Sequence, residues 1–240
     1  MLRNRLAALV ASSALAAAGV ALAPASASAD NGTYINSASI GSFYMGAQAS
    51  KTFTVTFDAD GADGGVDWWL ESAGGCYVFE SGTAEYAGGG LYTDTFLIFN
   101  DDLTNACAGA MELHSSAYAS DYSSSDSEDF VINFKRQARL VGQNFGPEPV
   151  RKGGTVTGTA KLERVSWDDG QYHGDANAYL YSQFRTTTGS YSTVRKVLTD
   201  SHGYATSKNT QSVDGCWRFV SLGYSTTTSY TPPGDCVDSV

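Results

Sequence analysis

Carboxylates are the side chains of this sequence best suited to chemistry, and four of them fall between residues 58 and 67. Asp58, Asp60 and Asp63 alternate there with small residues. Calcium takes about six to eight oxygen ligands and tolerates flexible loops, so these three residues are candidate calcium ligands. The run departs from the EF-hand pattern, because Trp69 stands where the bidentate glutamate belongs. Two hypotheses follow: an irregular calcium site, or an Asp/Gly-rich turn between two strands.

Catalytic signatures are missing from the sequence. Its three histidines, His114, His173 and His202, are accompanied by no HExxH, CxxC or G-x-S-x-G motif. Glycoside hydrolysis needs a pair of carboxylates, but nothing in the spacing of the acidic residues selects a pair. We therefore expect a non-enzymatic protein that needs no cofactor, calcium excepted. A calcium-dependent extracellular binding module and a small secreted glycan hydrolase are the two alternatives.

Aromatic residues make up 12 % of the chain and offer a second kind of chemistry. Sugars bind against flat aromatic faces that are flanked by polar groups. Tyr179 and Tyr181 flank Leu180, and the two-residue period of a strand places both tyrosines on the face opposite that leucine. They are candidate ligand-binding residues for a cell-wall or environmental polysaccharide or for a surface protein.

The elements that carry these residues are strands. Residues 51–57 alternate apolar and polar side chains without a break, residues 130–134 form a compact apolar run, and residues 155–162 alternate again. No helical period is evident, so we predict an all-β chain of two antiparallel β-sandwiches in tandem. Residues 81–90 are predicted to be turn-rich, and residues 120–129 a mobile acidic loop.

The domain boundaries follow from composition. Residues 1–29 combine two arginines, an apolar run and a closing Ala-Ser-Ala, which predicts a secretory signal peptide. Prolines and glycines in residues 141–153 lack amide donors or loosen the chain, which predicts a linker. It would separate an acidic β-sandwich domain, residues 30–140, from a second one, residues 154–240. No hydrophobic stretch closes the sequence, so we expect a secreted, extracellular protein without a membrane anchor.

Charge is divided unequally within a chain of net charge −10. Residues 30–145 hold 16 acidic and four basic residues, whereas residues 146–240 hold nine of each. An acidic half repels phosphate backbones, which argues against nucleic acid and anionic membranes as partners.

Four cysteines in an exported chain predict disulfides, because the compartment is oxidising. Three connectivities are open. Pairing Cys76 with Cys107 and Cys216 with Cys236 is the one that places one disulfide in each half, and it is the one we expect.

A resemblance covers most of residues 145–240. Its motifs are the Pro-Glu-Pro run at 147–149, Gln183-Phe184-Arg185, Trp217-Arg218 and Gly234-Asp235. Together they resemble the C-terminal domain of secreted actinobacterial proteins of the Streptomyces type, some of which are named for calcium binding. The resemblance implies an immunoglobulin-like extracellular module, and hence two immunoglobulin-like β-sandwich domains in tandem. The chain departs from the relatives at Cys216 and Cys236, where they tend to carry aromatic residues.

Overall fold

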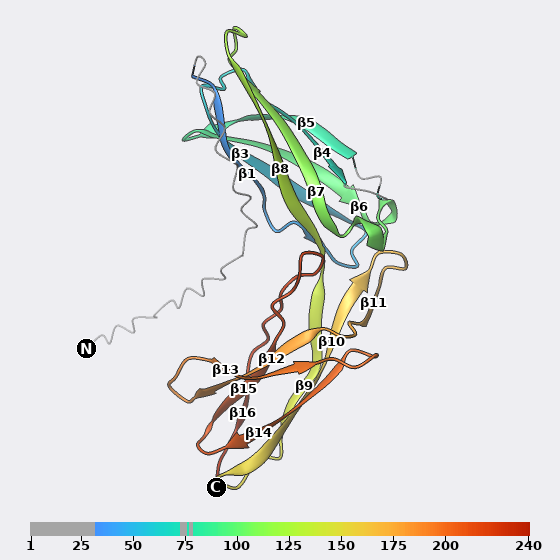
Figure 1. Ribbon diagram of the computed structural model, residues 1–240, viewed down its shortest axis with the longest axis vertical. Helices are drawn as coiled ribbons and strands as arrows, with labels where there is room; N and C mark the ends of the chain where they lie inside the picture. Colours follow the sequence, from blue (N-terminus) through green and yellow to red (C-terminus); the bar gives the residue numbers. More distant parts are fainter. Residues whose placement is uncertain (1–31, 73–75, 77–78) are drawn as a thin grey trace, which may run out of the picture.

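The protein is described by a computed structural model that covers residues 32–72, 76 and 79–240, so the predicted signal peptide lies outside the described residues. The described chain is all-β, as predicted, and forms two halves that lie end to end (Figure 1). Within that part of the chain, no helix has the length and apolar character needed to cross a membrane.

The first half is one eight-stranded sheet with the order β1-β3-β6-β5-β4-β7-β8-β2. All neighbours are antiparallel except β2 and β8. The sheet curls so that β1 and β8 come together. There the backbone amide of Ile35 donates to the Asp126 carboxylate over 2.9 Å. The elements are β1 (Tyr34–Ile40), β2 (Tyr44–Met45), β3 (Ser50–Asp60), β4 (Gly65–Ser72), β5 (Phe79–Gly88), β6 (Leu91–Phe99), η1 (Asn100–Asp102), η2 (Asn105–Cys107), β7 (Gly109–Tyr118) and β8 (Ser125–Arg136).

Alternation drives this curling, because each strand buries one face inside the sheet. In β3, Phe53, Val55 and Phe57 are buried while the residues between them are not. The interior is aromatic: the rings of Phe43 and Phe134 stack with centroids 4.4 Å apart, and Phe43 meets Phe53 edge to face at 5.2 Å. Such pairs add about 0.5–1.5 kcal/mol each beyond the burial of their area.

The second half consists of two four-stranded sheets that share one core. Leu162, Leu180 and Phe219 are fully buried between them. Gly158 lets the ring of Phe145 cross the strand, since a side chain at that position would collide with the ring. The strands are β9 (Ala138–Gly146), β10 (Gly154–Ser166), β11 (Gln171–Gly174) and β14 (Tyr204–Gln211) in one sheet, and β12 (Tyr179–Thr186), β13 (Ser192–Leu198), β15 (Gly215–Val220) and β16 (Asp235–Val237) in the other.

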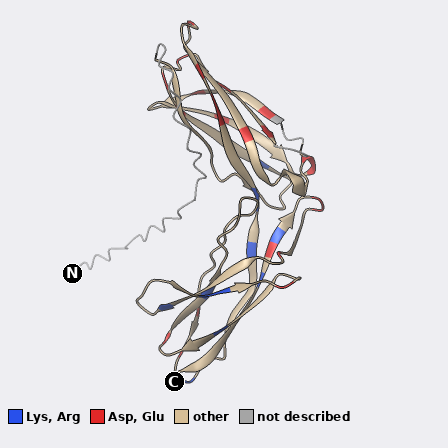
Figure 2. Cartoon of the chain, in the orientation of Figure 1, with Lys and Arg blue, Asp and Glu red and all other residues tan. Residues whose placement is uncertain are grey.

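Both expected disulfides form, Cys76 with Cys107 and Cys216 with Cys236. The tandem of immunoglobulin-like sandwiches is not confirmed, because the first half is a single curled sheet. The uneven distribution of charge persists in the fold, with acidic residues spread over the first half (Figure 2).

Two predicted loops are strands instead. Residues 81–88 belong to β5, and residues 125–129 begin β8, whose pairing with β7 extends to Ser125 opposite Tyr118. Both segments lack the apolar content that marks a strand in sequence. They are strands because residues 81–84 pair with β4, residues 85–88 with β6 and residues 125–129 with β7.

The predicted linker over residues 141–153 is wrong in its first part. Residues 141–146 lie in β9, which pairs with β10, and only Gln137 separates β9 from β8. The prolines begin after the strand has ended, so they do not interrupt its ladder. Val150 is in turn fastened to the C-terminal segment, since its amide donates to the Asp238 carbonyl and its carbonyl accepts from the Val240 amide.

Trp167 is the main contact between the halves. It follows β10, yet it is 3 % exposed and belongs to the core of the first half. Its ring lies 4.8 Å from that of Phe134, and its indole N–H donates to the Met45 carbonyl over 3.3 Å. The second half therefore fills part of the core of the first.

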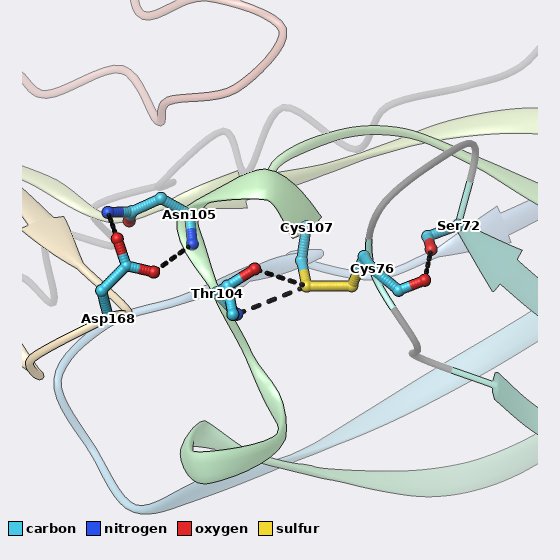
Figure 3. Close-up of a disulfide and its surroundings, with 6 residues drawn as sticks. All are labelled: Ser72, Cys76, Thr104, Asn105, Cys107 and Asp168. Atoms are coloured by element: carbon cyan, nitrogen blue, oxygen red, sulfur yellow. Dashed lines mark hydrogen bonds between the residues drawn. A yellow bond between two sulfur atoms is a disulfide. The ribbon is translucent and has the colours of Figure 1, made fainter.

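Asn105 ties the same junction together with hydrogen bonds (Figure 3). Its backbone amide donates to the Asp168 carboxylate over 2.9 Å. Its side-chain oxygen accepts one hydrogen bond from the Trp167 backbone amide over 3.0 Å and another from the Arg136 guanidinium over 2.7 Å. Burial lowers the pKa of Arg136 to about 10, which still leaves it charged at neutral pH. Because Asn105 lies in the turn that ends at Cys107, the first disulfide holds this turn in place.

Glu163 forms an ion-paired cluster close to the junction. Its side chain is 10 % exposed and accepts from Arg139 and Lys161, each over 2.8 Å. Burial raises the pKa of Glu163, but the hydrogen bonds and charges of Lys161 and Arg139 outweigh that effect, and the pKa lies below its ordinary value of 4.5.

Replacing Trp167 with alanine is expected to lower the free energy of unfolding by about 3–5 kcal/mol, because it empties a core position shared by both halves. Denaturant unfolding of the full chain measures this. Trp69→Ala, at a tryptophan that is 39 % exposed, is the matched control and should cost less than half as much. Equal losses in the two variants would contradict the role given to Trp167.

Glu163→Gln is expected to make the free energy of unfolding depend less steeply on pH in the acid range. A carboxylate whose folded-state pKa is depressed stabilises the fold fully above its unfolded pKa, and this contribution disappears as the pH falls through the folded value. Unfolding free energies between pH 7 and pH 3 should therefore fall less steeply in the variant, which starts about 1.5–3 kcal/mol less stable at pH 7. Glu85→Gln, at an exposed position of β5, should keep the wild-type slope.

Candidate ligand-binding face

The two predicted tyrosines lie where the sequence places them. Tyr179 and Tyr181 point away from the core on β12, while Leu180 between them is fully buried. Tyr179 is 44 % exposed. The strand register sets Lys196 of β13 directly opposite Tyr181, and Leu198 opposite Tyr179. Both tyrosines thus share one outer face with residues of the neighbouring strand.

Cations lie over the aromatic rings of this face. The Lys196 ammonium nitrogen is 3.5 Å from the centroid of Tyr179 and 5.8 Å from that of Tyr181. Further along the sheet, the guanidinium carbons of Arg218 and Arg185 lie 3.8 and 5.2 Å from the ring centroid of Tyr191. Such contacts orient each cation without neutralising its charge.

We call this surface the basic aromatic face and define it by Tyr179, Tyr181, Arg185, Tyr191, Lys196 and Arg218. It is connected through Gln183, whose side-chain oxygen accepts from the Arg218 guanidinium over 2.9 Å. Burial lowers the pKa of Arg218, which Tyr191 partly offsets, and the group stays charged at neutral pH.

The charge of this sheet contrasts with that of the rest of the chain. Strands β12, β13 and β15 contain four basic residues and no aspartate or glutamate, in a protein of net charge −10 (Figure 2). Opposite charges can steer and hold an anionic ligand, and the effect is strongest where no carboxylate competes for the cations. The face is therefore suited to acidic groups presented together with apolar ring surfaces.

The three predicted calcium ligands do not converge. Asp58 and Asp60 both accept from the side chain of Asn36, over 3.4 and 3.1 Å. Asp63 turns to another loop, where it accepts from the amide and hydroxyl of Ser120, each over 2.8 Å. The hydrogen bond from the Ser120 amide is the main reason why the pKa of Asp63 is lowered. A calcium site at these residues stays a prediction without a geometry to support it.

A different set of metal donors does converge. Among the described residues, one trio of His and acidic side chains offers ligand atoms within 4.8 Å of one another, namely Glu71, Glu112 and His114. Two strands of the first half supply it, far in sequence from the basic aromatic face.

A cleft of about 520 Å³ lies at the junction of the halves. Its lining includes Asp101, Asp168 and Asp169, so it disfavours the acidic ligands that suit the basic aromatic face. Asp168 is also occupied by its hydrogen bonds to Asn105.

Sequence reasoning found the tyrosines but missed the cations beside them. Lys196, Arg218 and Tyr191 come from separate segments, and only the strand register unites them. A signal was present in the sequence: residues 176–199 contain three basic residues and no acidic ones.

Comparison with known proteins adds little to this geometry. No family model matches the chain, and no curated protein matches it. One solved structure, described as a tetra-tandem repeat in the extending region of a large adhesion protein, is similar at 13 % sequence identity with a TM-score of 0.32. The match covers 86 % of this chain and 50 % of the other, so the chain spans about half that structure's length. A likeness this distant carries no argument, and the resemblance to secreted actinobacterial proteins stays a prediction.

Proposed function

We propose that this is a non-enzymatic extracellular binding protein whose basic aromatic face holds an acidic polysaccharide. The observation that carries the proposal is the pairing of cations with outward-facing tyrosine rings along β12, β13 and β15, three strands without aspartate or glutamate in an acidic protein. The two disulfides fit an oxidising, extracellular setting. The same proposal includes export directed by the predicted signal peptide and an immunoglobulin-like fold for the second half.

The chemistry of such a ligand matches the face. Tyrosine rings offer flat apolar surfaces for the C–H faces of sugar rings, with a hydroxyl at the edge. Lysine and arginine donate charge-assisted hydrogen bonds to carboxylates, sulfates or phosphates. Because Lys196 already lies against Tyr179, little side-chain freedom is lost when a ligand binds.

An extracellular protein is the second candidate partner, and one observation favours it. Among the described residues, strand β13 pairs with β12 alone and is an edge strand of its sheet, and Val194 and Leu198 on it are 51 % and 49 % exposed. An open edge can accept a strand from another chain. Arg195 and Lys196 on the same strand oppose indiscriminate pairing, as charged edge residues do.

The experiment is sedimentation of the full chain with an insoluble acidic polysaccharide, such as cross-linked polygalacturonate, and with cellulose as the neutral counterpart. We expect binding to the acidic polymer that weakens as salt is raised. Lys196→Gln combined with Arg218→Gln should weaken it about tenfold or more, since a lost charge-assisted contact is worth more than about 1.4 kcal/mol. Tyr179→Ala combined with Tyr181→Ala should weaken it as well.

Arg195→Gln is the matched control. It removes the same charge from the same strand, but residue 195 alternates with Lys196 and so points to the opposite face. This variant should bind like the wild type. Equal binding to cellulose, or equal losses in the control and the test variants, would contradict the proposal and turn the search toward a protein partner.

A further inference from the structure

The outer face of the first half gathers an imidazole and three carboxylates from three adjacent strands. Glu71 of β4 stands directly opposite Glu112 of β7, and His114 of β7 stands opposite Asp129 of β8. All four point outward, because the residues that alternate with them, Leu70, Leu113 and Phe130, are buried in the core. Strand register, more than loop conformation, thus fixes their relative positions.

Asp129 orients the imidazole of His114 from the side of the ring opposite to the two glutamates. Its Nδ1 lies 2.7 Å from an Asp129 oxygen, and because a carboxylate accepts hydrogen bonds, this contact places the imidazole proton on Nδ1. Nε2 faces Glu71 Oε1 at 3.2 Å and Glu112 Oε2 at 3.8 Å, so it either donates a second proton to Glu71 or offers its lone pair to a cation held between it and the two glutamates. The indole of Trp69 stacks on the imidazole with centroids 4.6 Å apart and fixes its plane.

We propose that Glu71, Glu112 and His114 bind a divalent transition-metal ion of the zinc class, with Asp129 as the group that orients the histidine. Ligand atoms about 2.0–2.2 Å from a tetrahedral zinc lie roughly 3.4 Å from one another. The separations of 3.2 and 3.8 Å from Nε2 bracket that value. A carboxylate that holds the far nitrogen of a metal-binding histidine is the usual second partner of such sites.

Two further features favour a transition metal. Glu71 and Glu112 are like charges directly opposite each other on neighbouring strands, an arrangement that is destabilising without a cation between them. Imidazole suits zinc, copper and nickel, whereas calcium and magnesium prefer oxygen ligands alone. Three protein ligands leave the fourth tetrahedral position open to water or to a ligand. The site is independent of the basic aromatic face, which lies in the other half.

The rival account is that protonated His114 alone bridges the carboxylates. Burial lowers the pKa of His114, but hydrogen bonding and the charges of Asp129 and Glu71 outweigh it, so the net pKa is raised. Both accounts use the same side chains. They differ in whether a metal ion binds when it is offered at neutral pH.

The test is calorimetric titration of the chelator-treated full chain with zinc chloride at pH 7.5, together with the visible absorption of bound cobalt. We expect one equivalent of metal per chain and an intense tetrahedral cobalt spectrum. His114→Gln should abolish both signals. Asp129→Asn should weaken the affinity about 10–100-fold, as loss of an orienting carboxylate does. These residues lie on the outer face, and circular dichroism verifies that each variant folds.

His173→Gln is the matched control. His173 also pairs with a carboxylate, Asp169 at 2.7 Å, but it belongs to no donor trio among the described residues. It should bind zinc like the wild type. Absence of zinc binding would overturn the proposal in favour of the ion-paired histidine. Retention of binding in His114→Gln, or equal affinity for calcium, would overturn it by assigning the metal to other residues or to oxygen ligands alone.

Discussion

The insertion of Trp167 into the core of the first half is the contact on which the architecture depends. Its indole packs among the aromatic rings of that core, 4.8 Å from Phe134. Around it, Asn105 accepts hydrogen bonds from Arg136 and Trp167 and donates to Asp168, and the first disulfide secures the turn that carries Asn105. The two halves therefore share part of one core, and each disulfide stabilises a separate part of the chain.

Much of the fold could be predicted from residue types and their spacing. The β class, the strand at residues 51–57 and both disulfides follow from residue types and spacing. What alternation could not reveal was the polar β1, the ladder through the acidic start of β8, and the extension of β9 into the predicted linker. Those segments are strands because of their neighbours, and their own side chains carry little information about it.

The candidate sites show the same division. Tyr179 and Tyr181 are two residues apart, so their common face could be predicted from one segment. Lys196, Arg218, and the trio of Glu71, Glu112 and His114 depend on cross-strand register, which no single segment contains. Of the three aspartates chosen from their local density, Asp58 and Asp60 accept from Asn36, whereas Asp63 accepts from Ser120.

The near continuity of β8 and β9 across Gln137 has a mechanical consequence. Thr33, close to the start of the described chain, contacts Ser124 at the end of β8 distant from the junction, and the C-terminus lies at the far end of the second half (Figure 1). Tension between the two ends would thus run along the strands and shear β1 against β3. Sheared strands load many hydrogen bonds at once, whereas peeled strands break them one after another.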